Sequence, residues 1–372
     1  MRRILWLIAA ALSVALPLRA ADFSLEKIAL NGYGSWYYGK TDNENRYLGA
    51  NEEGSYRSAN VHLSIAADVS ERLRVVTQVG WVDDEQGSEE DFDYIFAEWK
   101  LNPRVRLRLG KVKMPFGLYS EFPEVGTLRP FLSLPQAAYG PIGFLGESYK
   151  GLGLTGSFGG HWKADWDLYG GGTELSEDVA AEAYLLGEDL APGEDIEHEV
   201  TRNVLGGRMV LATPLPGLSV GASFLSGIEE VAAGRRRTVY GVQAEYAGEA
   251  VTVRSEFMHE DVVDDLHASG AYLEVSYRLS DRWQVAAEGG RLRTEFFGVQ
   301  PADEIVGLTR HDEVGMGVSY WFDSNLVVKV NYLRVRGNAF AHPVAEELPE
   351  VAAAGDLRSP TGVLLAGAQF TF

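Results

Sequence analysis

The sequence predicts an all-β protein, a transmembrane antiparallel β-barrel of about 16 strands with an inward-folded third loop. Three observations support this fold class. Segments with alternating polarity follow one another from residue 27 to the end of the chain, and the connections between them alternate between short and long. A tilted strand needs about 9–11 residues to cross a bilayer, and most segments are close to this length. The 42 glycines and the aromatic content of 11% fit strands flanked by aromatic girdles.

The N-terminus is predicted to form a secretory signal peptide. Two arginines precede an apolar run over residues 4–18, and small residues follow it. This order is typical of an export signal, and cleavage after Ala20 or Ala21 fits equally well. The run is shorter than the roughly 20 apolar residues of a membrane-spanning helix. We therefore expect residues 1–20 to be the signal peptide and residues 21–372 to be the barrel domain.

The charge balance and the absence of cysteine exclude several classes of protein. The chain has 33 basic and 53 acidic residues, which argues against nucleic acid as a partner. Without cysteine it can have neither disulfides nor a lipoprotein anchor. No other window is apolar enough to be a membrane helix, so a membrane would have to be crossed by strands. No residue pattern indicates a cofactor or a metal.

The polarity of the segments alternates with the period of a strand. Leu73, Val75 and Val79 alternate with Arg74 and Gln78, so one side of that strand is apolar and the other is polar. A soluble β-sandwich would use shorter strands, of about five or six residues. Aromatic residues gather near the segment ends, where a membrane barrel has its girdles. They are Tyr37, Tyr38, Trp81, Trp99, Trp162, Trp283, Tyr320, Trp321 and Phe322.

The connections fit an outer-membrane barrel, which has short periplasmic turns and longer extracellular loops. Tight turns are expected at residues 68–71, 214–217, 247–249, 280–282 and 323–325, and longer loops at 83–91, 173–199, 227–236, 260–269, 294–311 and 337–359. The first two of these loops are acidic and could bind divalent cations that bridge lipopolysaccharide. They lack the oxygen spacing and turn glycine of a calcium loop, so simple solvation is the favoured interpretation.

One strand carries a ladder of arginines and leads into a long apolar loop. Arg104, Arg106 and Arg108 occupy alternate positions, so their side chains point to the same side. Pro115 lacks an amide hydrogen and should end the strand. The segment over residues 115–148 is rich in Pro, Gly, Leu and Phe, and a loop of this length usually has a function. We expect it to fold inward against the arginines.

A barrel of about 16 strands leaves an aqueous channel. We therefore expect a porin, a channel for passive diffusion of small hydrophilic solutes or ions. An arginine about 5 Å from an anion in water contributes roughly 0.8 kcal/mol before screening, so the arginine strand could favour anions. The predicted pore-lining or constriction residues are Arg74, Arg104, Arg106, Arg108, Lys111, Lys113, Glu121, Glu124 and Arg129, the two lysines on condition of a kink at Gly110. Acidic residues in the inward phase, which should lie on a different wall, are Asp165, Asp167, Glu245, Glu256, Glu274, Glu288 and Glu313.

The last segment has the form of an outer-membrane sorting signal. Residues 361–372 alternate in polarity, and the chain ends on Phe372. A terminal aromatic residue on such a strand resembles the signal that directs bacterial barrels to insertion. We therefore expect export through the periplasm, the barrel-assembly machinery as a partner that recognises Phe372, and a location in the outer membrane of a Gram-negative bacterium, in contact with its lipid and lipopolysaccharide.

Three motifs resemble those of a known family. They are G-K-V-K-M-P-F-G at residues 110–117, R-P-F-L-S-L-P-Q at 129–136 and Y-K-G-L-G-L-T-G-S-F at 149–158. In these stretches the chain resembles the phosphate-selective porin O and P family. The resemblance implies a 16-stranded, trimeric outer-membrane channel whose third loop folds into the pore, with Lys111 and Lys113 facing it. Phosphate selectivity is not implied, because the dense basic arrangement behind it is limited here to one strand.

Two other classes of protein remain as alternatives. An outer-membrane protease would need paired carboxylates and a histidine at the barrel rim, and Asp264, Asp265 and His267 form the only local candidate. Such residues in a loop are more often solvated surface, so we expect no enzyme. A structural or adhesive barrel with a plugged lumen is the second alternative, and it would show no conductance.

Overall fold

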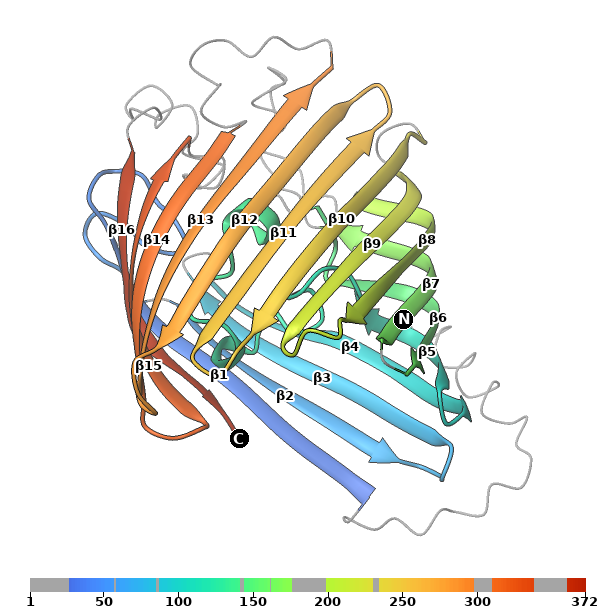
Figure 1. The fold of residues 1–372 in the computed structure, drawn as a ribbon. Helices are drawn as coiled ribbons and strands as arrows, with labels where there is room; N and C mark the ends of the chain where they lie inside the picture. The colour runs from blue at the N-terminus through green and yellow to red at the C-terminus, as the bar shows by residue number, and fades with distance from the viewer. Residues whose placement is uncertain are drawn as a thin grey trace.

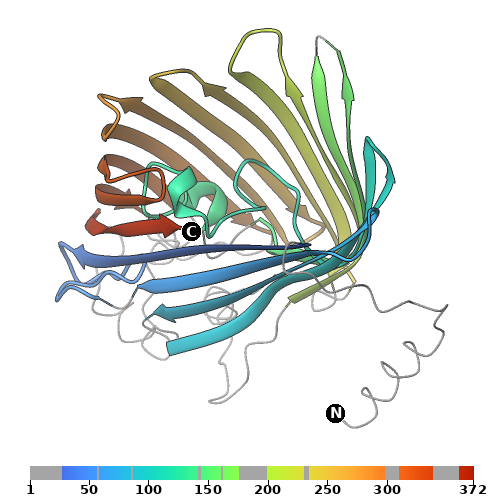
Figure 2. The same cartoon turned by 90° about the horizontal axis from the view of Figure 1, so that it is seen from below.

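The computed structural model describes residues 27–56, 58–84, 87–140, 144–160, 162–175, 199–229, 234–297, 310–337 and 360–372. Within these ranges, 16 antiparallel strands form a closed barrel in which every strand pairs with its neighbours in sequence (Figures 1 and 2). The predicted fold class is confirmed. The predicted signal peptide, residues 1–20, lies outside the described residues.

The strands are long, as expected for a membrane barrel. They are β1 (Ile28–Thr41), β2 (Ala59–Asp68), β3 (Leu73–Asp84), β4 (Gly87–Asn102), β5 (Val105–Lys113), β6 (Ser148–Gly159), β7 (Lys163–Leu175), β8 (Glu199–Ala212), β9 (Leu218–Glu229), β10 (Arg236–Ala247), β11 (Val251–Val262), β12 (Leu266–Arg278), β13 (Trp283–Phe296), β14 (Arg310–Trp321), β15 (Leu326–Arg336) and β16 (Thr361–Thr371). Two short helical turns, η2 (Gly126–Leu128) and α2 (Gln136–Tyr139), lie between β5 and β6. No helix among the described residues is long and apolar enough to span a membrane.

The barrel has apolar side chains outside and polar side chains inside, which is the reverse of a soluble protein. On β15, Val328, Val330 and Tyr332 are 37–47% exposed, whereas Lys329 and Asn331 between them are almost fully buried. The same alternation recurs on β14 and β16. An apolar outer surface of this kind matches lipid, and the polar inner surface matches water or a polar plug.

The barrel closes through β1 and β16, the first and last strands of the chain. Tyr33 of β1 pairs with Thr371 of β16 in an antiparallel register. A side chain at Gly32 would collide with the ring of Phe372, since a Cβ there would lie 2.0 Å from the ring. The amide of Phe372 donates a hydrogen bond to the Gly32 carbonyl oxygen at 2.9 Å. The terminal aromatic residue is therefore seated at the seam that makes the barrel continuous.

Two predicted loops are wrong, because the strands continue through them. The acidic loop at residues 83–91 is a tight hairpin in which Asp84 of β3 pairs with Gly87 of β4. At residues 260–269, β11 and β12 continue to Val262 and Leu266. Strands that extend beyond a membrane remain paired in water, so polar and charged residues there do not mark a loop. The predicted loops at 173–199, 294–311 and 337–359 lie largely outside the described residues, and of the predicted loop at 227–236 residues 227–229 belong to β9 and residue 236 begins β10.

The segment between β5 and β6 does not join the barrel wall. Its described part, residues 114–140 and 144–147, is called the inner segment below. Five of its apolar side chains, Met114, Phe116, Phe131, Leu132 and Phe144, are at most 3% exposed. Figure 2 shows the inner segment between the walls of the barrel, next to the inner face of the later strands. The inner segment and the strand residues that it contacts form the candidate functional site.

Candidate functional site

Acidic side chains of the later strands bind the inner segment. Glu256 on β11 accepts hydrogen bonds from the Leu118 amide at 2.8 Å and from the hydroxyls of Tyr139 and Tyr272, each at 2.6 Å. Burial and the neighbouring Glu256 raise the pKa of Tyr139 well above its ordinary value, so this hydroxyl remains a donor. The Tyr119 hydroxyl donates to Glu274 on β12 at 3.0 Å. These acids therefore hold the inner segment and do not face open water.

A buried lysine holds the second half of the inner segment. The ammonium group of Lys329 donates to the carbonyl oxygens of Gly126 at 2.8 Å, Arg129 at 2.6 Å and Phe131 at 3.3 Å. It also contacts the side-chain oxygen of Gln369 at 2.5 Å. Lys329 is fully buried, so these carbonyl oxygens replace its water shell. The turn around η2 is thereby fixed to β15 and β16.

Further hydrogen bonds continue this attachment to neighbouring strands. The Leu132 amide donates to Asn331 on β15 at 2.8 Å, and the Ala137 amide donates to Glu313 on β14 at 3.3 Å. We call the inward face of β11–β16 the covered wall. Its five inward glutamates, Glu256, Glu260, Glu274, Glu288 and Glu313, are 2–7% exposed. Their negative charges are largely withdrawn from the solvent in the lumen.

The inward face of the earlier strands carries arginines that are less enclosed. Arg108 on β5 donates to Glu98 on β4 at 3.0 Å. Arg208 on β8 donates to Asp167 on β7 at 3.0 Å and to Glu121 of the inner segment. Glu121 also lies 3.8 Å from Arg108, so it bridges the two arginines. We call this inward face of β3–β8 the basic wall.

Two further arginines of the basic wall are more exposed. The side chains of Arg74 and Arg106 are 43% and 46% exposed, and their nearest carboxylates are 3.7 and 3.8 Å away. The strand register arranges the row, because Glu98 pairs with Arg74 on one side and with Arg108 on the other. These four arginines thus face four partner carboxylates, those of Asp68, Glu98, Glu121 and Asp167. Their formal charges balance, so Arg74 and Arg106 are distinguished by their exposure and not by an excess of positive charge.

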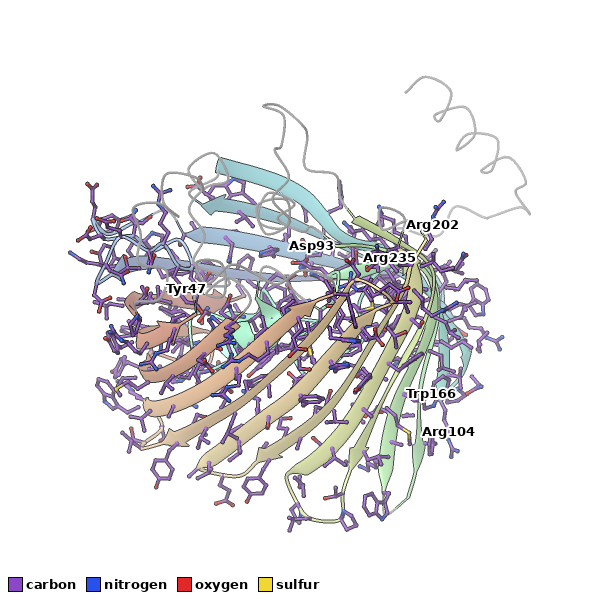
Figure 3. All side chains as sticks on the ribbon, turned by 90° about the horizontal axis from the view of Figure 1, so that it is seen from above. Tyr47, Asp93, Arg104, Trp166, Arg202 and Arg235 are labelled. Atoms are coloured by element: carbon purple, nitrogen blue, oxygen red, sulfur yellow. The ribbon has the colours of Figure 1, made fainter. Side chains whose placement is uncertain are left out.

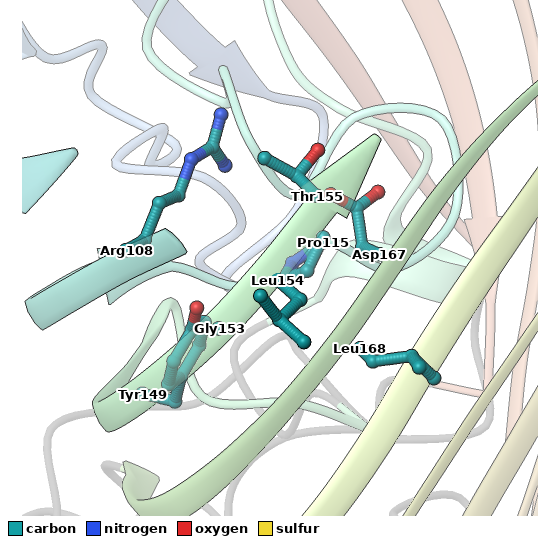
Figure 4. Close-up of a pocket in the computed structure, with 8 residues that line it drawn as sticks. All are labelled: Arg108, Pro115, Tyr149, Gly153, Leu154, Thr155, Asp167 and Leu168. Carbon is teal, nitrogen blue, oxygen red and sulfur yellow. The ribbon is translucent and has the colours of Figure 1, made fainter. Parts of the chain in front are cut away.

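A small pocket lies where the inner segment leaves the basic wall. In Figure 4 the polar ends of Arg108, Thr155 and Asp167 point into the same space, with Pro115 beside them. The Tyr149 hydroxyl packs against Gly153, where a Cβ would lie only 2.0 Å from it, so a side chain at this position would displace the tyrosine. The space is too small to admit a water molecule, and the Asp167 carboxylate already accepts a hydrogen bond from Arg208, so this group is a packed polar contact.

The structure separates some of the predicted site residues from this group. Arg104 lies in the turn before β5, and Figure 3 shows it at the edge of the barrel near Trp166. The ammonium group of Lys111 donates to the backbone carbonyl oxygen of Phe92 on β4. Both groups lie apart from the Arg108 and Arg208 pair. The prediction that all three arginines of the ladder act together is therefore not supported for Arg104, because the strand begins one residue later.

The remaining predicted residues anchor the inner segment. Lys113 is 5% exposed and pairs with Glu124 and with Glu147, the latter at 2.9 Å. Arg129 donates to the carbonyl oxygens of Pro123 and Leu132, the latter at 2.9 Å. These contacts lie within the inner segment or at its start. Lys113, Glu124 and Arg129 thus shape the segment.

One group within the described part of the chain has ligand atoms close enough for a metal ion. Potential ligand atoms of His62, Asp93 and Glu124 all lie within 4.8 Å of one another. The carboxylate of Asp93 already accepts hydrogen bonds from His62 at 2.9 Å and from Gln78 at 2.7 Å. Lys113 already supplies a positive charge to Glu124. The group is therefore satisfied as a polar network.

Sequence reasoning missed Arg208 and Lys329, which both contact the inner segment. The signal for them was present, because each is a charged residue in the inward phase of its strand. Two of the candidate protease residues, Asp265 and His267, lie in ion pairs. Asp265 pairs with Arg235 at 2.8 Å, and His267 lies 3.3 Å from Asp261.

Comparisons with known proteins define the class of barrel. No protein-family model and no curated protein matches the chain. Among solved structures, the anion-selective porin from Comamonas acidovorans has a TM-score of 0.57 at 9% identity, over 93% of this chain and 99% of that chain. OmpF of Salmonella typhi in complex with daunomycin has a TM-score of 0.57 at 12% identity, over 93% of this chain and 97% of that chain.

A trimer form of OmpT, an outer membrane protein of Vibrio cholerae, has a TM-score of 0.53 at 9% identity, over 93% of this chain and 99% of that chain. At such identities the similarity shows the fold alone. The chain is a 16-stranded transmembrane β-barrel that resembles the porins of Gram-negative outer membranes.

Proposed function

We propose that this protein is an outer-membrane porin through which small hydrophilic solutes or ions diffuse passively, with a preference for anions. The single observation that carries the preference is a difference in solvent exposure between the acidic side chains of the covered wall and the arginines of the basic wall. The inward glutamates of the covered wall are buried, three of them in hydrogen bonds to the inner segment, whereas Arg74 and Arg106 of the basic wall are more than two-fifths exposed. A permeating anion would therefore meet arginine more often than carboxylate.

The inner segment would form the constriction of this pore. It crosses from β5 to the covered wall and is fixed there by Glu256 and Lys329. Glu121 brings one of its carboxylates to the basic wall, where Arg108 and Arg208 neutralise it. Solutes would pass between the inner segment and the basic wall.

Conductance of the refolded full-length protein in planar bilayers tests this proposal. We expect steady single-channel conductance, and under a salt gradient a reversal potential on the anion side. A reversal potential on the cation side would overturn the anion preference. A barrel that inserts but never conducts would overturn the porin itself.

A plugged structural or adhesive barrel is the second candidate, and one observation favours it. The inner segment buries five large apolar side chains and donates or accepts hydrogen bonds along much of its length. A segment held in this way could fill the lumen. In that case the bilayer measurement gives no conductance even when insertion is verified separately.

We further propose a homotrimer, export through a signal peptide over residues 1–20, insertion guided by Phe372, and no enzymatic activity. The trimer form of a protein with the same fold supports the first point. The motif at residues 110–117 supports membership of the phosphate-selective porin O and P family. Chemical cross-linking in native membranes tests the trimer, because a ladder ending at a dimer or monomer would contradict it.

A further inference from the structure

Five arginines gather on the outer surface of the barrel, away from the lumen. They lie near one end of three neighbouring strands, β13, β14 and β15, in the phase that faces outward. They are Arg291, Arg293, Arg310, Arg334 and Arg336. The net charge of the whole chain is −20, so such a basic patch on its surface is not expected from composition. We call it the outer arginine patch.

The strand register brings these arginines side by side. Arg293 pairs directly with Arg310, and Asp312 pairs with Arg291 on one side and with Arg336 on the other. Neighbouring strands are about 4.8 Å apart and alternate residues of one strand about 6.8 Å apart, so the patch spans little more than one lipid headgroup. Several guanidinium groups can therefore reach a single ligand.

The patch has fewer acidic partners than arginines. Asp312 accepts hydrogen bonds from Arg291 and Arg293, each at 2.8 Å. Arg334 donates to Asp42 at 2.6 Å. Among the described residues, Arg310 and Arg336 make no ion pair. Within the described part of the chain, no carboxylate neutralises these two guanidinium groups.

The position of the patch indicates what that anion is. Directly below it on the same outward phase, Val314 and Met316 are 65% and 64% exposed, and Tyr332 is 44% exposed. These apolar and aromatic side chains belong to the surface that faces lipid tails and the membrane interface. The patch thus lies just above the hydrocarbon region, at the height of lipid headgroups.

The end of the barrel at which the patch lies is the one with long connections. At this end the sequence joins β13 to β14 through residues 297–309, whereas the opposite ends of β12 and β14 continue into tight turns. In outer-membrane barrels the long connections are extracellular. The headgroups at this height would then be those of the outer leaflet.

We infer that the outer arginine patch binds the phosphate groups of lipopolysaccharide in the outer leaflet. This inference rests on the proposed outer-membrane location, but not on conductance. Guanidinium groups bind phosphate oxygens with two parallel hydrogen bonds, and partial removal from water strengthens them. Arg310 and Arg336 make the main contribution to binding. Arg291, Arg293 and Arg334 contribute less, because Asp312 and Asp42 already neutralise part of their charge.

The test measures the affinity of the detergent-purified full-length barrel for lipopolysaccharide in mixed micelles. The double variant Arg310→Gln/Arg336→Gln should bind it roughly tenfold more weakly than the wild type. The matched control is Arg278→Gln/Arg282→Gln, which removes two arginines at the opposite end of the barrel. We expect this control to bind as the wild type does.

Three results would overturn the inference. The first is that Arg310→Gln/Arg336→Gln binds lipopolysaccharide as tightly as the wild type does. The second is that the control variant loses as much affinity as this variant. The third is that the wild type binds lipopolysaccharide without phosphates as tightly as it binds intact lipopolysaccharide. Competition by inorganic phosphate at similar concentration would show a site for free anions and not for lipid. The variant should keep wild-type conductance and heat-modifiable migration, so a failure of the lipid site is distinguishable from a failure of the porin. Arg310→Lys/Arg336→Lys should restore part of the affinity, because charge remains without the paired hydrogen bonds.

Discussion

The two inner walls of the barrel both carry charged side chains, but only one leaves them accessible. On the covered wall, β11–β16, the inward glutamates are 2–7% exposed, and the inner segment donates hydrogen bonds to Glu256, Glu274 and Glu313. On the basic wall, β3–β8, Arg74 and Arg106 remain 43% and 46% exposed. The loop that would narrow the pore thus also removes negative charge from it.

This difference shows that the charge of a lumen cannot be read from composition. The chain as a whole is strongly acidic, and its inward phase carries many carboxylates. A carboxylate that accepts three short hydrogen bonds, as Glu256 does, is desolvated and cannot attract a cation in the pore. What matters for a permeating ion is which charges remain in contact with water.

The largest effect is expected from Lys329→Met, which breaks the covered wall. Four hydrogen-bond acceptors lose their buried donor, and a loss of roughly 2–5 kcal/mol in the attachment of the inner segment is expected. Release of the inner segment would expose the glutamates. We therefore predict a larger single-channel conductance together with a shift of the reversal potential toward cations.

Lys40→Met is the control for this prediction, because Lys40 is exposed on β1 in the outward phase of Trp36. It should leave both quantities unchanged. Unchanged conductance and selectivity in correctly folded Lys329→Met would mean that the covered wall is held without this lysine.

The next effect is expected on the basic wall, from the triple variant Arg106→Gln/Arg108→Gln/Arg208→Gln. It removes the guanidinium partners of Glu121 and Asp167 and two of those near Glu98, so the wall becomes negatively charged. Three arginines each contributing somewhat under 0.8 kcal/mol predict a fall of roughly tenfold in the ratio of anion to cation permeability. Reversal potentials measure this ratio, and a ratio equal to that of the wild type would remove the basic wall from the selectivity mechanism.

The fold could be predicted from the sequence because the signal is local. Alternation along β15, with valines outward and Lys329 and Asn331 inward, needs only the period of a strand. The hairpin at Asp84 and Gly87 could not be predicted in the same way. A strand beyond the membrane is not required to be apolar, so its residues read as a loop.

The site was less predictable, because partners lie on strands far apart in sequence. Glu121 meets Arg208 across 87 residues, and Lys329 meets Gly126 across 203 residues. Strand phase gives the side of the wall on which a residue lies, but not which loop residue covers it. Lys111 and Lys113 were expected to face the pore together if the strand kinks at Gly110. In the structure their partners differ, because Lys113 is buried with Glu124 whereas Lys111 donates to a backbone carbonyl oxygen of β4.

A smaller effect is expected from ionic strength, and it separates the two walls without mutation. The exposed charges of Arg74 and Arg106 are screened over about 10 Å at 0.1 M salt and about 3 Å at 1 M. Anion preference should therefore decline steadily as salt concentration rises, measured at a fixed concentration ratio. The attachment of the inner segment is buried and should not respond, so the current noise at constant voltage should stay the same. A preference that persists at 1 M would indicate selection by desolvated contacts, such as those around Arg108 and Thr155.

The smallest effect is expected from Arg104→Gln, which defines where the basic wall ends. Arg104 shares the alternation of Arg106 and Arg108 in sequence, but it lies in the turn before β5 at the barrel edge. A charge there is separated from the constriction by water and is screened within about a Debye length. We predict a reversal potential equal to that of the wild type, whereas Arg106→Gln alone should lower the anion preference measurably. A loss in Arg104→Gln as large as that in Arg106→Gln would show that selectivity begins at the mouth of the barrel, and the basic wall would then have to be extended to the turn.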